Sequence, residues 1–400
     1  MTVALQFCQL HWSSKIWLNK MTWPPSGDTN VTMLLCTWLG GEGEHVPLDI
    51  QEYNTLVRWL HQNDYRPENL IDRTCVETAA RQTGLSDDRL IALLGRSITL
   101  GFYLEEWQRR DYWIIGRGDA AYPKRVRQHL RSSAPPVLFG TGEPKLLNGG
   151  ITAVIGPDQV MEQSNEHARA MAAFCAQHHR ITIAAGKQTI SAGVAESGIG
   201  HGGSVIWVLQ GPVFGEPLRK SFRRAKAAGK FMMLSGRSPA DKRSLSQEPE
   251  VGRIAMALCD SAMYIDGTEL SGDRYCLEDA MYRVLDQKKC FVWYMGQATA
   301  AAERLLQGGA TSWIDMEMEV HEGLFEDRAK ISSHEPSQLA EPEGELAQEE
   351  SPKSPVTRDT AEDETKADAG TEKSDAKKTD TPSIKVSVRF GEQGDLFESM

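Results

Sequence analysis

The sequence predicts an α/β fold in which a doubly wound, mainly parallel sheet follows a small helical domain and precedes a disordered tail. Short apolar segments alternate with helical segments between residues 120 and 310, and glycines stand at the ends of several of them, as turns require. Strands that alternate with helices form parallel sheets with helices on both faces, and such sheets bind ligands at the carboxyl ends of their strands. The predicted strands are Ile151–Ile155, Ile181–Ala185, Ser204–Leu209, Ala262–Asp266 and Cys290–Met295.

Residues 28–118 are expected to form the helical domain. Thr29–Leu39 is short and mostly apolar, and Asp49 is followed three residues later by Glu52, which is the spacing of a capping box. Helical domains of this kind assist DNA binding or form homodimers, and a scaffold role is the alternative. Residues 1–27 form an N-terminal extension without the charged-then-apolar layout of a signal peptide.

Composition and cysteine usage favour a cytoplasmic protein. The chain of 400 residues carries a formal charge of −11, and its seven cysteines form no Cys-x-x-Cys pair. Several of them lie in apolar runs, which is typical of reduced core residues in the cytoplasm. No apolar run has the length that a bilayer requires, so we expect no membrane span.

Residues 326–383 are predicted to form an acidic, disordered linker. The stretch from Glu335 to Thr381 contains 14 acidic and 6 basic residues, a local charge of −8. The rest of the chain therefore carries only −3, and DNA binding by the folded part is compatible with the acidic total. Aliphatic and aromatic residues are almost absent, so the linker cannot bury enough apolar surface to offset chain entropy.

Residues 384–400 carry a short motif. Gln393 is followed by a glycine and then by Asp395, Leu396 and Phe397. The motif resembles the peptide with which bacterial DNA-metabolism proteins dock on the sliding clamp, although Gly394 stands where leucine is usual. Leu396 and Phe397 suit an apolar pocket and Gln393 suits its polar rim. The bacterial sliding clamp is therefore an expected partner, and a chance sequence is the alternative.

Several short motifs follow one another along the predicted sheet domain. They are Tyr122-Pro123, Pro135-Pro136, Gly202-Gly203, Gly252-Arg253-Ile254-Ala255 and Ser271-Gly272-Asp273. Their order resembles the DNA-processing protein A family (DprA, also called Smf), and the resemblance extends roughly from Leu48 to Trp313. It implies a Rossmann-like domain over residues 119–325 and DNA as the partner.

The pocket motifs depart from that family. Gly156-Pro157-Asp158 stands where the family has Gly-Ser-Arg, so a carboxylate replaces a phosphate-binding arginine. Ala185-Gly186 replaces Ser-Gly, Ser191 replaces an aspartate and Ala195 replaces a histidine. The resemblance therefore implies a retained scaffold with an altered pocket. The expected pocket residues are Gly156, Gly186, Gly203, Ser271 and Gly272.

The segment Leu218–Lys230 is strongly basic. It carries six cations and no acid, and a helix there would present a stripe that neutralises phosphates. A solvated helix face is the alternative, but such faces usually mix both signs of charge. Arg237, Lys242 and Arg243 would extend the patch. The predicted DNA-binding residues are Arg219, Lys220, Arg223, Arg224, Lys226 and Arg253.

Carboxylates follow the predicted strands at the edge where ligands bind. Asp158 follows the first strand, Asp266 and Glu269 follow the fourth, Asp273 lies in the late turn and Glu278 in the next helix. Capping of loops and helix starts explains any one of them. Together they suit the stabilisation of positive charge or the activation of water.

Two functions compete for this site. The superfamily that includes DprA also includes hydrolases that cut the bond between base and ribose, and Ser271-Gly272-Asp273 with Glu278 is similar to their motif. The first hypothesis is a DNA N-glycosylase with Asp273, Glu278 and Asp158 as catalytic residues, removing bases, including modified phage bases, from clamp-loaded DNA in antiviral defence. Trp207 and Trp293 would stack on a flipped base, although core packing explains them more simply.

The alternative, which the resemblance implies, is a non-catalytic single-strand DNA-binding protein that helps to load a recombinase. A small-nucleotide sensor would fit the fold but not the C-terminal motif. No cofactor or metal is expected. Gly198, Gly200 and Gly203 have dinucleotide-motif spacing but precede a strand, and His178-His179 lacks partners at metal-ligand spacing.

Overall fold

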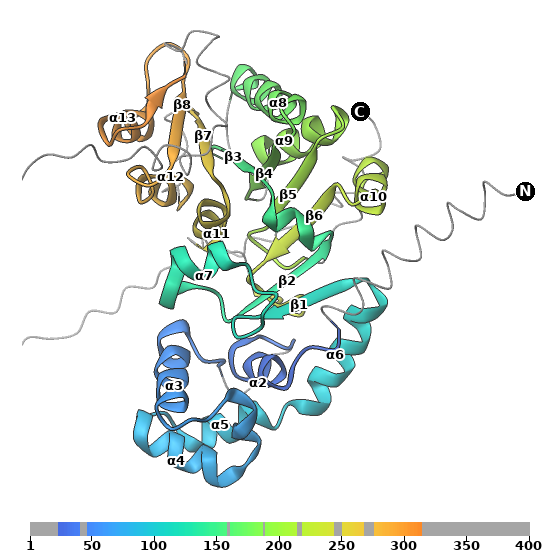
Figure 1. The fold of residues 1–400 in the computed structure, drawn as a ribbon, viewed down its shortest axis with the longest axis vertical. Coiled ribbons are helices and arrows are strands. Elements are labelled where there is room, and N and C mark those ends of the chain that lie inside the picture. The colour runs from blue at the N-terminus through green and yellow to red at the C-terminus, as the bar shows by residue number, and fades with distance from the viewer. Residues whose placement is uncertain are drawn as a thin grey trace, which may run out of the picture. The chain divides into compact units, whose positions relative to one another are not determined.

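The computed structural model describes residues 23–40, 46–157, 161–186, 189–213, 218–243, 250–267 and 276–313 (Figure 1). Its strands are β1 (Tyr112–Gly116), β2 (Val137–Gly142), β3 (Ile151–Ile155), β4 (Ile181–Ala185), β5 (Ser204–Val208), β6 (Phe231–Ser235), β7 (Ser261–Ile265), β8 (Lys289–Trp293) and β9 (Thr311–Ser312). Within the described ranges they form one nine-stranded sheet in the order β1-β2-β6-β5-β4-β3-β7-β8-β9.

The sheet is doubly wound, as predicted. All neighbours from β6 to β9 are parallel, whereas β1 pairs with β2 and β2 with β6 in antiparallel orientation. The chain leaves β3 toward β4, β5 and β6 on one side and returns to β7, β8 and β9 on the other. The order therefore reverses between β3 and β7, and sheets of this kind bind ligands at the carboxyl ends of the strands at such a point.

Helices cover both faces of the sheet. They are α7 (Lys124–Leu130), α8 (Glu162–Gln177), α9 (Thr189–Gly200), α10 (Lys220–Ala227), α11 (Glu250–Leu258), α12 (Cys276–Tyr282) and α13 (Ala300–Gln307), with short 3₁₀ helices at Arg131–Ser133 and Pro144–Asn148. Successive strand residues point to opposite faces, so they divide between two apolar cores. One core contains side chains from α7, α11, α12 and α13, and the other contains side chains from α8, α9 and α10 (Figure 1).

A helical region precedes the sheet. It contains α2 (Gly27–Cys36), α3 (Ile50–Gln62), α4 (Arg73–Thr83), α5 (Asp87–Leu94), α6 (Ser97–Arg109) and the 3₁₀ helix Pro67–Ile71. Asp49 caps α3 by accepting from the backbone nitrogen of Glu52 at 2.8 Å, while the Glu52 carboxylate accepts from the backbone nitrogen of Asp49 at 2.9 Å. The predicted capping box is confirmed. In the described part of the chain no helix combines the length and the apolar character needed to cross a bilayer.

One strand lies within the range expected for the helical domain. Tyr112–Gly116, inside residues 28–118, pairs with β2. Its Tyr-Trp-Ile-Ile sequence places aromatic and β-branched side chains between two apolar layers, which favours a strand.

Asp119 and Arg117 join the helical region to the sheet. The Asp119 carboxylate accepts hydrogen bonds at 2.7 Å from the hydroxyls of Ser26 and Thr29. The Arg117 guanidinium donates to the side-chain oxygen of Asn54 at 2.8 Å. These contacts fix the start of α2 and the middle of α3 against the loop that follows β1.

Candidate nucleic-acid interface

The predicted basic stripe lies on α10. Phe222 and Ala225 are buried on the inner side of this helix, and the Phe222 ring centroid lies 5.8 Å from that of Trp207 and 5.0 Å from that of Phe231. Residues three positions apart share one side of a helix. The contacts of Phe222 and Ala225 therefore turn the opposite side of α10 toward solvent.

Three cations occupy that outer side. Lys220, Arg223 and Arg224 are exposed, and none of them forms an ion pair with another residue in the described ranges. α10 contains no acidic residue. Arginine matches the geometry of phosphate oxygens with two parallel N–H donors. The outer side of α10 is therefore suited to a phosphate backbone.

The other predicted cations are placed differently. Arg219, the residue before α10, forms an ion pair with Glu196 of α9, so its charge is partly neutralised. Lys226 is half-buried in the last turn of α10. Arg253 lies on α11, which packs on the opposite face of the sheet, so the structure does not bring it together with the cations of α10.

Arg237 does not extend this surface, contrary to expectation. Its side chain is only 4% exposed and donates to the Asp241 carboxylate at 2.9 Å. Arg243 donates to the same carboxylate at 2.7 Å and stacks over the Trp38 ring at 4.7 Å from the centroid. Arg237 is therefore buried in an ion pair, whereas Arg243 is half-exposed and is held against Asp241 and Trp38.

The glycines predicted to line a pocket lie at two different edges of the sheet. Gly156 follows β3 and Gly186 follows β4, so both lie at the carboxyl edge. A side chain at Gly156 would be excluded by close packing, because its Cβ would lie 2.6 Å from the carbonyl oxygen of Ile265. Gly186 has a φ of 107°, which favours glycine, and its carbonyl oxygen accepts a hydrogen bond from the Trp207 indole at 3.1 Å. Gly203 precedes β5 and lies at the amino edge, so the structure does not bring it together with Gly156 and Gly186.

Several predicted site residues lie outside the described residues. They are the carboxylates Asp158 and Asp273, the turn residues Ser271 and Gly272, and the motif residues Gln393, Asp395, Leu396 and Phe397.

Glu278 is the predicted catalytic carboxylate that the structure does place. It lies in the first turn of α12, and its side chain is 11% exposed. Arg304 of α13 donates to Glu278 at 3.3 Å and to Asp279 at 2.7 Å. Burial raises the pKa of Glu278, and the charge of Arg304 opposes that rise. A raised pKa suits proton transfer, and the ion pair also serves to tie α12 to α13.

Asp266, at the carboxyl end of β7, has a structural task. Its carboxylate accepts hydrogen bonds from the backbone nitrogen of Thr299 at 2.8 Å, from the Thr299 hydroxyl at 2.6 Å and from the backbone nitrogen of Gly267 at 2.9 Å. Thr299 is the N-cap of α13. Asp266 therefore holds the start of α13 against β7.

The tryptophans expected near the site make internal contacts. The Trp293 ring stacks on His167 of α8 with a centroid distance of 4.3 Å, and Trp207 packs on Phe222. Burial lowers the pKa of His167 to about 4, and its Nε2 has no hydrogen-bond partner in the described part of the chain. Core packing therefore explains both tryptophans. No cluster of three or more metal-binding side chains occurs among the residues that the structure describes.

Comparison with protein families places this chain among DNA-processing proteins. The family model described as DNA recombination-mediator protein A matches residues 113–322, which is more than half of the chain. A comparison with the curated proteins found no match.

A comparison with solved structures found the fold of DNA processing protein A. DNA processing protein A from Streptococcus pneumoniae has 16% sequence identity and a TM-score of 0.53 over 70% of this chain and 95% of its own. DNA processing protein A from Helicobacter pylori, whose structure concerns a mode of single-stranded DNA binding, has 17% identity and a TM-score of 0.42 over 53% of this chain and 95% of its own.

Proposed function

The chain belongs to the DNA recombination-mediator protein A family, and from this premise we propose that it is a non-catalytic protein that binds single-stranded DNA through α10 and assists recombination. The observation that carries the proposal is the outer side of α10, where Lys220, Arg223 and Arg224 are exposed without an ion pair among the described residues. Cations of this kind neutralise phosphates and release counterions, which is the main source of affinity for a nucleic-acid backbone.

The preference for single strands is tested directly. The full chain is titrated into labelled single-stranded and duplex oligonucleotides of equal length at several salt concentrations. We expect tighter binding to the single strand and an affinity that falls steeply as salt increases. Equal affinity for both would reject the single-strand preference, and no binding to either at low salt would reject the DNA-binding function.

The C-terminal motif supports a second partner. We propose that Gln393, Asp395, Leu396 and Phe397 bind the bacterial sliding clamp. A short peptide binds weakly, but attachment to a chain already held on DNA raises its effective concentration. The intact chain should retain the clamp in a pull-down, and a chain truncated at Phe390 should lose it. Equal retention by both chains would contradict this assignment.

A DNA N-glycosylase is the second candidate function. The specific observation in its favour is Glu278, a mostly buried carboxylate at the carboxyl edge of the sheet whose pKa is raised by burial. Incubation of the full chain with plain and base-modified DNA, followed by an assay for abasic sites, tests it. Abasic product that disappears in Glu278→Gln would support the enzyme. An absence of product from the unmodified chain would leave the DNA-binding function alone.

A further inference from the structure

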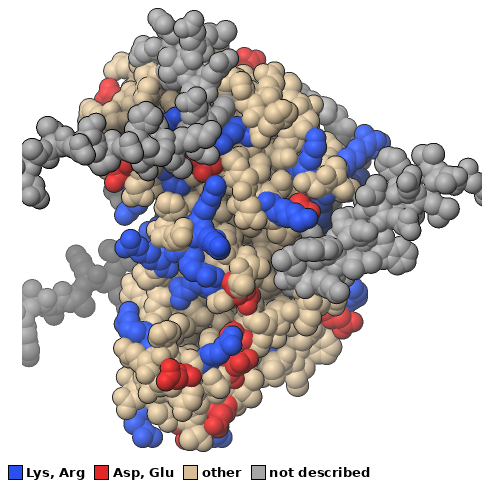
Figure 2. Space-filling view, viewed as in Figure 1, with Lys and Arg blue, Asp and Glu red and all other residues tan. Residues whose placement is uncertain are grey.

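A second basic surface lies on α7, on the sheet face opposite α10. The segment Lys124–Arg131 carries four lysines or arginines, one histidine and no acid. Val126 is fully buried, whereas Lys124, Arg127 and Arg131 are exposed and are spaced three and four positions apart. The spacing of three positions places Lys124 and Arg127 on one side of the helix, and Arg131, with a φ of 49°, is the residue directly after it. Figure 2 shows Lys and Arg side chains gathered over the position that α7 has in Figure 1.

Side-chain contacts of Arg125 and Arg127 hold α7 in a fixed orientation. Arg125 donates to the carbonyl oxygen of Leu258 at 3.0 Å and pairs with Asp260 at 3.2 Å. Arg127 donates to the carbonyl oxygen of Asp119 at 2.8 Å. Because these contacts come from both sides of the helix, the exposed cations are carried by a rigid element, which lowers the entropy lost on binding.

Two acidic residues that contact α7, Asp260 and Asp119, are already engaged. The Asp260 carboxylate accepts from Arg180 at 3.1 Å and from the backbone nitrogen of Ile151 at 2.7 Å in addition to its pair with Arg125. The Asp119 carboxylate is turned toward the hydroxyls of Ser26 and Thr29. Neither carboxylate therefore neutralises the outer side of α7.

Lys124 and Arg131 form no ion pair with another residue of the described ranges. Burial lowers the pKa of the neighbouring His129, and the positive charges of Lys288 and Arg125 lower it further. The local field around α7 is therefore positive.

We propose that Lys124 and Arg127 of α7, together with Arg131 directly after it, bind the phosphate backbone of DNA as a contact surface separate from α10. The inference rests on the proposed function, since DNA is the partner in both. Lys124 and Arg127 are about 4.5 Å apart along the helix axis, and Arg131 follows directly after the last residue of α7. Because α7 and α10 cover opposite sheet faces, they contact different stretches of DNA.

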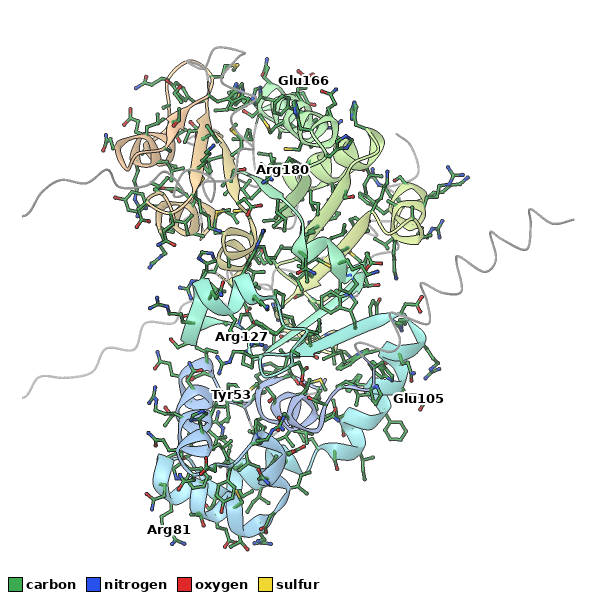
Figure 3. All side chains as sticks on the ribbon, viewed as in Figure 1. Tyr53, Arg81, Glu105, Arg127, Glu166 and Arg180 are labelled. Carbon is green, nitrogen blue, oxygen red and sulfur yellow. The ribbon has the colours of Figure 1, made fainter. Side chains whose placement is uncertain are left out.

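Neutralisation of the two unpaired cations tests the surface. In the full chain, Lys124→Gln with Arg131→Gln removes two phosphate contacts, which should reduce the salt dependence of single-strand binding by about 1.4 in log–log slope. Affinity at 0.1 M salt, relative to a 1 M reference, should fall by about 25-fold. The matched control is Arg73→Gln with Arg81→Gln in α4. Figure 3 shows Arg81 at the far end of the helical region from Arg127.

The outcome separates this inference from the proposed function. Wild-type affinity and slope in the α7 variant would overturn the α7 surface, even if neutralisation of α10 weakens binding. Loss of affinity in the α7 variant with no loss in the α10 variant would support the α7 surface and reject α10 as the site.

A photo-crosslinking residue at Gln128 identifies what covers the surface. Gln128 is exposed one turn after Lys124, on the same side of α7. Crosslinking to a labelled single-stranded oligonucleotide supports the inference. The acidic stretch from Glu335 to Thr381 carries a charge of −8 and is the other available anion. Crosslinking to that stretch alone, with DNA in excess, would overturn the inference.

Discussion

Replacement of Lys220, Arg223 and Arg224 by glutamine should remove most of the DNA affinity of α10 without unfolding the chain. The three side chains are exposed and the substitutions leave the buried side of α10, with Phe222 and Ala225, unchanged. Glutamine has a helix propensity close to those of lysine and arginine. The thermal midpoint should therefore stay within a few degrees of wild type.

The size of the effect follows from the number of phosphates that the helix neutralises. Each phosphate bound on a single strand contributes about 0.7 to the slope of log affinity against log salt. Three fewer neutralised phosphates reduce the slope by about 2, and between 1 M and 0.1 M salt this corresponds to an affinity loss of about 100-fold. Fluorescence anisotropy of a labelled oligonucleotide at four or more salt concentrations measures the slope and the affinity together.

Arg219→Gln, at the residue before α10, is the matched comparison. Because Arg219 is already paired with Glu196, its neutralisation should cost less affinity than neutralisation of Arg224, which has no ion pair among the described residues. Arg81→Gln, in α4, controls for the change in net charge. A triple variant that retains the wild-type slope and affinity would refute the reasoning, because the charges would then make no contact with DNA.

Three further predictions concern the scaffold. Phe222→Ala should lower the free energy of unfolding by about 3–5 kcal/mol, as measured by urea denaturation, because the ring is buried between Trp207 and Phe231. The control Ser221→Ala, on the exposed side of α10, should change that free energy little. Asp266→Ala should cost about 1–3 kcal/mol by leaving the start of α13 without its acceptor, and an unchanged urea midpoint would contradict this role. The pKa of His167 is lowered to about 4 in the folded chain, so the unfolded chain binds the proton more tightly. The free energy of unfolding should therefore fall as the pH is lowered from about 6.5 to about 4. The measurement compares urea midpoints at pH 7 and pH 5, and the midpoint should fall less in His167→Gln than in the wild type. Equal falls in the two proteins would contradict this role of His167.

The central strands could be predicted because each is an apolar run with a glycine or polar turn beside it. Predicted and observed bounds agree within two residues for the five strands from β3 to β8 that the sequence singled out. β1 was missed because Tyr112–Gly116 follows directly on a helix, and the sequence does not show that the chain reverses there to pair with β2. β6 was missed because Phe231–Ser235 follows directly on the basic run, whose charge is the stronger local signal.

The candidate site was predictable where a property belongs to one segment. The charge of α10 can be read from consecutive residues, and the same criterion would have found Lys124–Arg131, which also contains four cations and no acid. Partners distant in sequence were not predictable. Asp266 is occupied by Thr299, 33 residues later, and nothing local to Asp266 indicates that contact. The burial of Arg237 likewise depends on how the loop after β6 folds around Asp241.

The distribution of charge bears on whether the departure at Asp158 requires an enzyme. The resemblance to the family implies a phosphate-binding arginine at that turn, and its replacement by a carboxylate was one of the reasons to expect catalysis. Exposed cations without ion pairs in the described ranges are available instead on the outer side of α10 and at α7. A protein that binds the phosphate backbone of DNA with two helices does not need an arginine at the carboxyl edge of its sheet. Its affinity depends on the number of neutralised phosphates rather than on which element supplies the charge. The loss of the arginine is therefore consistent with binding alone, and detection of an abasic product becomes the observation that an enzymatic function requires.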